Sequence, residues 1–135
     1  MLTLEIAAWT LEASLAKARE LERPVTIVVV DAGGHVVTSA RMDGARFLTY
    51  EIAYGKAHGC VGFHRTGHEV ATFGQAAVAF SSALAVASDG RFFPALGSIR
   101  LVRNGEEIGA VGVSGGSGEE DHQIAQAGVD AAASA

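Results

Sequence analysis

The chain has 135 residues, 49% of them hydrophobic and 19% charged, and its formal net charge at pH 7 is −5. This length is enough for one domain with a substantial core, and the acidic balance argues against nucleic acid or an anionic membrane as a partner. The single cysteine, Cys60, excludes an internal disulfide and a cysteine-rich metal site.

The first predicted element is a helix over residues 3–22. Thr3 is a suitable N-cap, Pro24 ends the helix, and apolar residues recur between them at helical spacing. The segment carries four acidic residues and no basic stretch at its start, so we do not expect a secretory signal. No apolar run approaches the roughly 20 residues of a membrane span. We therefore expect a cytoplasmic protein without a membrane partner.

A β-hairpin is predicted next, with strands at 25–31 and 35–41 joined by Ala32-Gly33-Gly34. The two glycines supply the positive φ angles that a tight turn requires. His35 begins the second strand, beside a backbone that bears no side chain. A histidine in this position either hydrogen-bonds its own loop or belongs to a site.

The central part of the chain is predicted to be largely helical. Residues 42–45 read as a turn, 46–62 as a helix and 67–73 as a short further segment. The small apolar residues of 76–88 suit either a buried helix or a tightly packed strand. Residues 89–98 are expected to be a loop, because Pro94 interrupts regular structure.

A second hairpin is predicted over 99–115, with Asn104-Gly105 at its tip. The last helix begins after Ser117, and Glu120 three residues later completes a capping box. Two hairpins combined with helices predict an α+β fold: an antiparallel sheet with helices packed on its faces, in a single domain over 1–135. The shortage of surface charge indicates a homo-oligomer, either a dimer or a larger assembly.

Two motifs near the carboxyl end have structural explanations. Residues 112–116, GVSGG, match a nucleophile elbow around Ser114, but no large parallel sheet and no acid-then-histidine order accompany them. A hydrolase is therefore not expected. The helix after Ser117 offers free N–H groups to an anion. However, Glu119, Glu120 and Asp121 in its first turn would repel one, which favours self-capping.

The other candidate residues are histidines and loop aromatics. His64 and His68 are four residues apart, which suits either two metal ligands on one helical face or two solvated loop histidines. His58 and His122 are expected at the surface. The stretch 92–94, Phe-Phe-Pro, either caps the core or forms a wall for a flat apolar ligand. The sequence lacks a C-x-x-C-H motif, which excludes covalent attachment of haem.

Several blocks together resemble the GlcG/HbpS family, which includes the C-terminal domain of PduO-type proteins. These blocks are VVVDAGGHVVTSARMDGA, IAYGKAHG, FFP and NGEEIGAVGVSGGSGEEDHQIAQAG, in the family's order over about residues 4–132. The resemblance implies a profilin-like sheet with helices on its faces, assembled into dimers or larger oligomers. Several members bind haem, and others accompany catabolic pathways as proteins without a settled reaction.

Two segments depart from the family's pattern. Residues 63–67 read FHRTG where relatives have Phe-Gly-x-Pro-Thr. After Phe93-Pro94, residues 95–100 read ALGSIR, without the Gly-Gly-x-Pro-Ile loop of relatives. Both segments border the pocket that the resemblance implies, so they bear on which ligand this chain takes.

In the family these pieces converge at a pocket between the sheet and the helices. The ligand-binding candidates that the resemblance implies are His35, Arg41, Met42, Asp43, Phe47, Lys56, Phe93 and Pro94. Arg41 and Lys56 would hold carboxylates such as haem propionates, or else form surface ion pairs. Asp43 belongs to this pocket or caps the helix that follows.

Two functions remain open at this level. In the first, the chain binds haem b non-covalently for haem handling or sensing, with His35 at the iron and His64 or His68 as the next candidates. In the second, it is a cofactor-free enzyme or accessory protein for a small acidic or aromatic metabolite. His35 would then be the catalytic general base.

Overall fold

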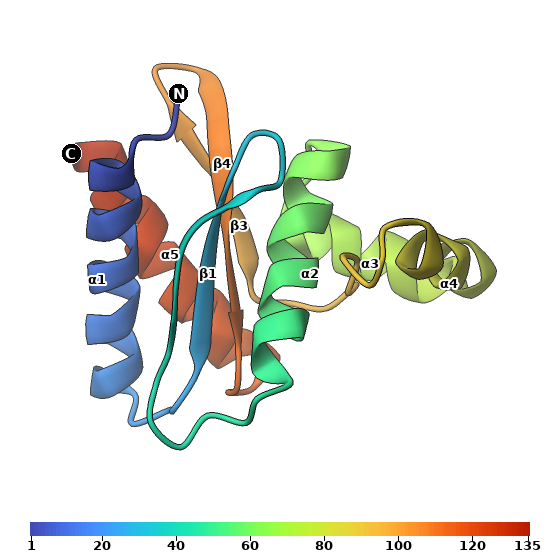
Figure 1. Cartoon of the computed structure of the whole chain (residues 1–135), viewed down its shortest axis with the longest axis horizontal. Helices are drawn as coiled ribbons and strands as arrows, with labels where there is room; N and C mark the ends of the chain where they lie inside the picture. The colour runs from blue at the N-terminus through green and yellow to red at the C-terminus, as the bar shows by residue number, and fades with distance from the viewer.

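The computed structural model describes residues 1–135 as five helices and one four-stranded sheet (Figure 1). The elements are α1 (Leu4–Glu20), β1 (Thr26–Asp31), β2 (Val36–Arg41), α2 (Thr49–Phe63), α3 (Gly67–Ala76), α4 (Val78–Ala87), β3 (Ser98–Arg103), β4 (Glu106–Ser114) and α5 (Gly118–Ser134). All neighbouring strands are antiparallel, in the order β2-β1-β4-β3. The predicted α+β class, with a sheet built from two hairpins, is confirmed.

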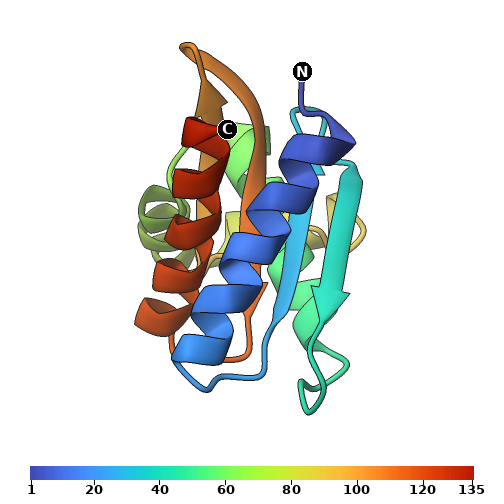
Figure 2. The ribbon, with the colours of Figure 1, turned by 90° about the vertical axis from the view of Figure 1, so that its left-hand side faces the viewer.

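Helices cover both faces of the sheet. α1 and α5 lie side by side on one face (Figure 2), and α2 packs on the other. Side chains of the central strand β1 alternate between the two cores: Ile27 and Val29 pack under α1 and α5, whereas Val28 and Val30 pack under α2. This alternation follows from the two-residue period of a strand and explains why residues 27–30 of β1 are all apolar.

The predicted helix starts are confirmed at both ends of the chain. Thr3 Oγ1 accepts the N–H of Ile6 at 3.1 Å and caps α1. Ser117 and Glu120 form both hydrogen bonds of a capping box at the start of α5. Each helix is thereby fixed at the end where its backbone N–H groups have no partner within the helix.

The start of α2 differs from the prediction. The helix begins at Thr49 rather than at residue 46, because residues 47–48 form a separate turn. The N-cap position is Leu48, which makes no capping hydrogen bond. The expectation that Asp43 caps this helix is therefore wrong, since Asp43 lies in an earlier exposed turn.

The ambiguous central segment is helical and forms an arm, α3–α4, that projects from the α2 side of the molecule (Figure 1). Ala77 separates the two helices with a non-helical backbone, φ −103° and ψ 67°. In α4 only Ser81 is buried, and its hydroxyl donates to Gly74 O at 2.7 Å. No single helix of the chain is long and apolar enough to cross a membrane; α3 and α4 reach that length and composition only as a pair bent by 112°.

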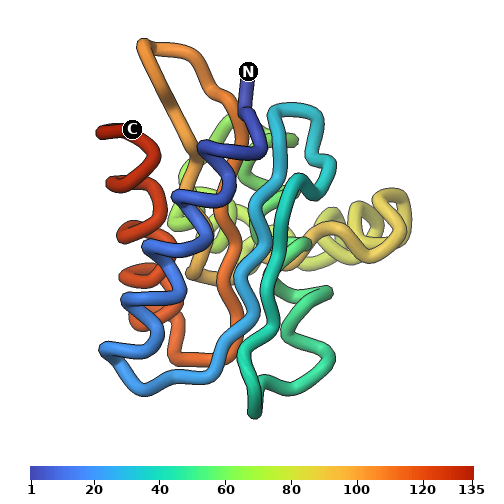
Figure 3. Tube along the Cα trace, turned by 60° about the vertical axis from the view of Figure 1, so that its left-hand side comes forward, coloured from blue at the N-terminus to red at the C-terminus, as the bar shows by residue number.

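Strand β2 separates two groups of predicted site residues. It begins immediately after His35 and ends at Arg41, which pairs with Thr26 at the start of β1. Six strand residues span about 20 Å. The turn before β2 and the turn after it lie at opposite ends of the sheet (Figure 3). His35 therefore lies at one end, and Arg41, Met42 and Asp43 at the other.

Candidate functional site

The turn between β1 and β2 presents His35 to solvent. Asp31 Oδ1 accepts the N–H groups of Gly33 at 2.9 Å and His35 at 3.0 Å, which fixes the turn through its own first residue. Gly34 has φ +81°, a conformation that favours glycine. The His35 side chain is 82% exposed, and its Nδ1 lies 3.5 Å from Asp31 Oδ1. The imidazole is thus free to meet a ligand.

The same turn rests on two side chains of α2. Tyr54 Oη donates to Gly34 O at 3.1 Å, and a Cβ on Gly34 would lie 2.7 Å from Cδ2 of His58. Glycine is therefore required here for a second reason, the close approach of the His58 ring. Burial lowers the pKa of His58, and the charges of Arg91 and His35 lower it further. Both effects favour the neutral form of the His58 imidazole, which lies close to His35.

Arg91 completes this group from the loop that follows α4. Its guanidinium lies 5.7 Å from the centre of the Tyr54 ring, within the range of a cation–π contact. The side chain is exposed and forms no ion pair with any carboxylate of the chain. We refer to His35, Tyr54, His58 and Arg91 as the hairpin site.

A small apolar cavity of about 120 Å³ adjoins the hairpin site. It extends between α2, the end of α4 and the following loop, and its lining residues are His58, Gly59, Gly62, Phe63, Leu84, Ser88, Arg91 and Phe92. Phe92 is almost fully buried, whereas Phe93 is 42% exposed. Phe92 thus closes the core and lines the cavity, whereas Phe93 faces outward against Gly55 of α2 and does not line it.

Of the residues predicted for one pocket, only His35 belongs to the hairpin site. Arg41, Asp43 and Phe47 are exposed at the opposite end of the sheet, and Met42 packs at the edge of the α1–α5 core. Pro94 packs against Gly74 of α3. The structure therefore does not bring these residues together. The length of β2 separates His35 from Arg41, Met42 and Asp43.

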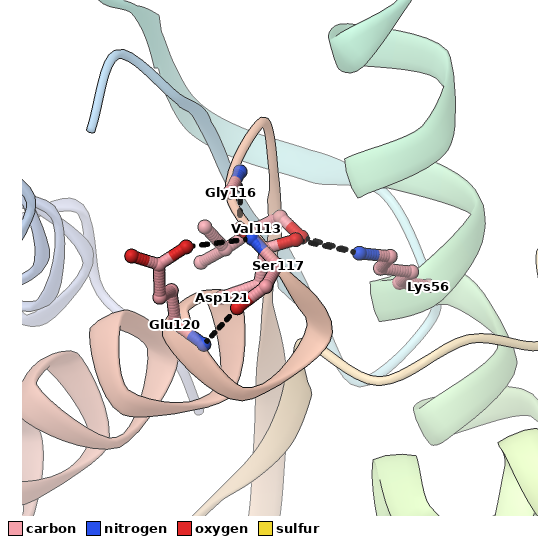
Figure 4. Close-up of polar contacts among 6 residues, drawn as sticks. All are labelled: Lys56, Val113, Gly116, Ser117, Glu120 and Asp121. Carbon is pink, nitrogen blue, oxygen red and sulfur yellow. Dashed lines mark hydrogen bonds and ion pairs between the residues drawn. The ribbon is translucent and has the colours of Figure 1, made fainter.

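Lys56 is buried and paired inside the protein, which corrects both readings of this residue (Figure 4). Its Nζ donates to Val113 O at 2.8 Å and to Asp121 Oδ2 at 3.2 Å, and each side chain of the pair is only 4% exposed. Asp121 Oδ1 accepts the Gly116 N–H at 2.9 Å. Lys56 holds a carboxylate of its own chain, so it is neither a surface ion pair nor open to a propionate.

The opposite charges of Lys56 and Asp121 counteract the effect of burial on the pKa of each group. Burial lowers the pKa of Lys56 and raises that of Asp121, and each residue counteracts the shift of the other. Together they connect α2, the end of β4 and α5. Two of the three carboxylates in the α5 first turn are thus occupied within the protein: Asp121 by Lys56, and Glu120 by Arg23 Nε at 2.7 Å. Self-capping of this helix is confirmed.

The i, i+4 spacing of His64 and His68 does not place them on one helical face. α2 ends at Phe63, and His64 caps it in the left-handed conformation, φ 53°; α3 starts only at Gly67. His64 Nδ1 lies 3.0 Å from Glu107 Oε2, while His68 packs edge-on against His122, ring centres 4.7 Å apart. No group of three potential metal ligands exists in the chain.

The sequence does not single out three members of the hairpin site. The expectation that His58 lies at the surface is wrong, since its side chain is half-buried, and no motif marks Tyr54 or Arg91. The i, i+4 spacing of Tyr54 and His58 is a signal that both side chains lie on one face of a helix. No sequence signal shows that this face meets the turn of the first hairpin, because that contact depends on how α2 crosses the sheet.

Comparison with known proteins identifies the family. The model of the family "Haem degrading protein HbpS-like" matches residues 2–130. An uncharacterized 15.0 kDa protein in the dhaT-dhaS intergenic region of Citrobacter freundii is 33% identical over 129 residues, 96% of this chain and 90% of the relative. The fold and these matches show that the chain belongs to the HbpS-like family, so the resemblance seen in the sequence is confirmed.

Two further relatives connect the chain with PduO. The corrinoid adenosyltransferase PduO of Citrobacter freundii is 34% identical over 119 residues, 88% of this chain but only 35% of PduO. The chain thus spans about a third of that enzyme's length. The solved structure of a PduOC:heme complex has a TM-score of 0.85 and 32% identity, covering 96% of this chain and 94% of the other.

Proposed function

We propose that this protein binds haem non-covalently at the hairpin site, for haem handling or sensing. The observation that carries the proposal is the exposed imidazole of His35, held next to the half-buried imidazole of His58 and the unpaired guanidinium of Arg91. Membership of a family of haem-degrading proteins and the likeness to a PduOC:heme complex support haem as the ligand.

The residues of the hairpin site fit the parts of a haem molecule. An imidazole nitrogen is a common axial ligand of haem iron, and His35 is the most accessible imidazole at the site. Arg91 has the geometry and charge to hold a propionate. Phe63, Leu84 and Phe92 supply apolar wall beside these polar groups. Bound haem would supply iron chemistry there, while the protein orients it and restricts access of water.

The hairpin site of one chain encloses too little space for this ligand. Its cavity of about 120 Å³ is below the roughly 300–1,000 Å³ of typical small-molecule sites. Large apolar side chains stand exposed on the neighbouring arm: Phe73, Val78, Phe80 and Val86. We therefore propose a homo-oligomer in which the α3–α4 arm meets a second copy and closes the cavity.

Light scattering tests the oligomer. At micromolar concentration the wild type is expected at a multiple of 13.9 kDa. Val86→Glu should shift the mass toward one chain, because Val86 is 83% exposed on α4 and an interface would bury the new charge. Val102→Glu, on the edge strand β3, is the matched control and should leave the mass unchanged. A wild type of 13.9 kDa would contradict the proposal.

Hemin titration tests the ligand and His35. Wild-type protein should bind hemin saturably, with a Soret band, and His35→Ala should shift the Soret maximum and weaken binding without changing the oligomer. His64→Ala and His68→Ala are the comparison variants. If the spectrum is unchanged in His35→Ala but shifted in one of these, that histidine is the ligand instead.

A second candidate function follows from the same polar groups. The guanidinium of Arg91 beside two imidazoles also suits a small organic acid, with His35 as general base near neutral pH. Absence of saturable hemin binding by the wild type would favour this function. The dependence of any turnover on His35 would then be the next measurement.

A further inference from the structure

A second cavity lies at the opposite end of the sheet from the hairpin site. It has a volume of about 660 Å³ and lies between the start of α2, the turn before it and the end of β4. Arg46, Thr49 and Ser114 are its polar side chains, and Leu48 and Ile52 are its large apolar ones. We refer to it as the Arg46 groove. Its volume is within the range of sites for small molecules.

Arg46 brings an uncompensated positive charge to this groove. Its side chain is exposed and forms no ion pair or hydrogen bond within the chain, and none of the residues that line the groove is acidic. The protein as a whole has a net charge of −5. The groove is therefore locally positive on a protein that is negative overall, and its guanidinium favours an anionic ligand.

Ser114 offers a hydroxyl that has no partner in the protein. The neighbouring hydroxyls are occupied: Thr49 Oγ1 donates to Arg46 O, so Thr26 Oγ1 donates to Thr49 Oγ1 at 2.7 Å. Ser114 pairs with Thr26 across β1 and β4, is 6% exposed and makes no side-chain hydrogen bond. Because this hydroxyl lines the groove and has no partner within the chain, it is available to a ligand there.

Two glycines, Gly44 and Gly115, line the groove beside Arg46 and Ser114 and leave it open because they have no side chain. Gly44 and Gly115 have φ +87° and +136°, and a Cβ on Gly115 would lie 2.6 Å from Pro24 O. Glycine is therefore required at residue 115 by both backbone conformation and space. The sequence motif around Ser114, which no nucleophile chemistry explains, thus has a role in shaping a cavity.

We propose that the Arg46 groove binds a small monocarboxylate with an apolar body, such as an aromatic acid. Arg46 holds the carboxylate, to which its planar guanidinium can donate two parallel hydrogen bonds. Ser114 donates a further hydrogen bond, and Leu48 and Ile52 contact the apolar body. The site is independent of the haem proposal, because about 20 Å of strand separates it from His35.

Titration with benzoate, followed through the backbone amide signals of ¹⁵N-labelled full-length protein, tests this site. Saturable shifts are expected at Gly44, Gly115 and Gly116. Benzamide has the same shape without the charge and should bind about tenfold more weakly or not at all. Arg46→Gln should weaken benzoate binding about tenfold or more, and Ser114→Ala several-fold.

Arg19→Gln is the matched control, because Arg19 is exposed on α1 and its loss changes the net charge equally. It should leave benzoate affinity unchanged, and Arg46→Gln should keep the melting temperature of the wild type. The proposal is overturned if wild-type protein shows no saturable shift at these glycines. It is equally overturned if Arg46→Gln binds as the wild type does, or if the shifts occur only around His35.

Discussion

Replacing Lys56 with methionine is expected to lower the free energy of unfolding by about 3–5 kcal/mol. The substitution leaves the carboxylate of Asp121 buried without its counter-charge, and breaking a buried pair on one side costs this much. Urea denaturation of wild type and variant measures the difference. Lys17→Met is the control, since Lys17 forms a surface pair with Glu20 and its loss should cost about 1 kcal/mol or less.

The same variant should respond to pH in a defined direction. Burial already raises the pKa of Asp121, and removal of the Lys56 charge raises it further. A carboxyl group with a raised pKa in the folded state binds its proton more tightly than in the unfolded state. The folded variant is therefore favoured at low pH and loses stability as pH rises through that pKa. A deficit relative to wild type that is no larger at pH 8 than at pH 3.8, the ordinary pKa of an aspartate, would contradict this account.

Gly112→Ala is expected to destabilise the protein by about 3 kcal/mol, at the upper end of the usual range for overpacking. A Cβ at this position would lie 2.0 Å from Ala53 O and 3.0 Å from Ala57 Cβ, so α2 would have to move away from the sheet. Because α2 also carries Lys56, Tyr54 and His58, such a movement would disturb both the buried pair and the hairpin site.

Gly62→Ala is the matched control: it adds the same methyl group to α2, the helix that Gly112→Ala would displace. Nothing lies within 4 Å of a Cβ at residue 62, so the substitution should stabilise α2 by up to about 1 kcal/mol through helix propensity. Thermal and urea unfolding of both variants make the comparison. Equal stability of the two variants would show that α2 can move on the sheet at little cost.

The elements of this fold are largely predictable because each depends on local chemistry. Thr3, Asn104-Gly105 and Ser117 with Glu120 act on their own neighbours, and the structure has a cap, a turn and a capping box at these positions. The start of α2 differs from the prediction because residues 46–48 are compatible with a helix, but 47–48 form a separate turn. Residues 76–88 are ambiguous in the sequence because small apolar side chains have no clear period.

The candidate site was less predictable because it depends on contacts between distant segments. His35 is predictable because its position beside Gly33-Gly34 is a local signal. The role of Lys56 is not predictable, since no spacing in the sequence shows that Asp121 lies 3.2 Å away. The same holds for Arg91, because its place above Tyr54 depends on the path of the α3–α4 arm.

The α3–α4 arm also has a consequence for how this protein can change. The chain leaves the core at the end of α2 and returns at the start of β3, where Cys60 Sγ and Ser98 Oγ are 3.0 Å apart. The segment between Cys60 and Ser98 therefore starts and ends at neighbouring points of the core. A segment of this kind can vary in length and sequence without disturbing the fold. Residues 63–67 and 95–100 lie where this segment leaves and rejoins the core. Changes of length or sequence between them would therefore alter the wall next to His58 without touching the sheet or its buried ion pair.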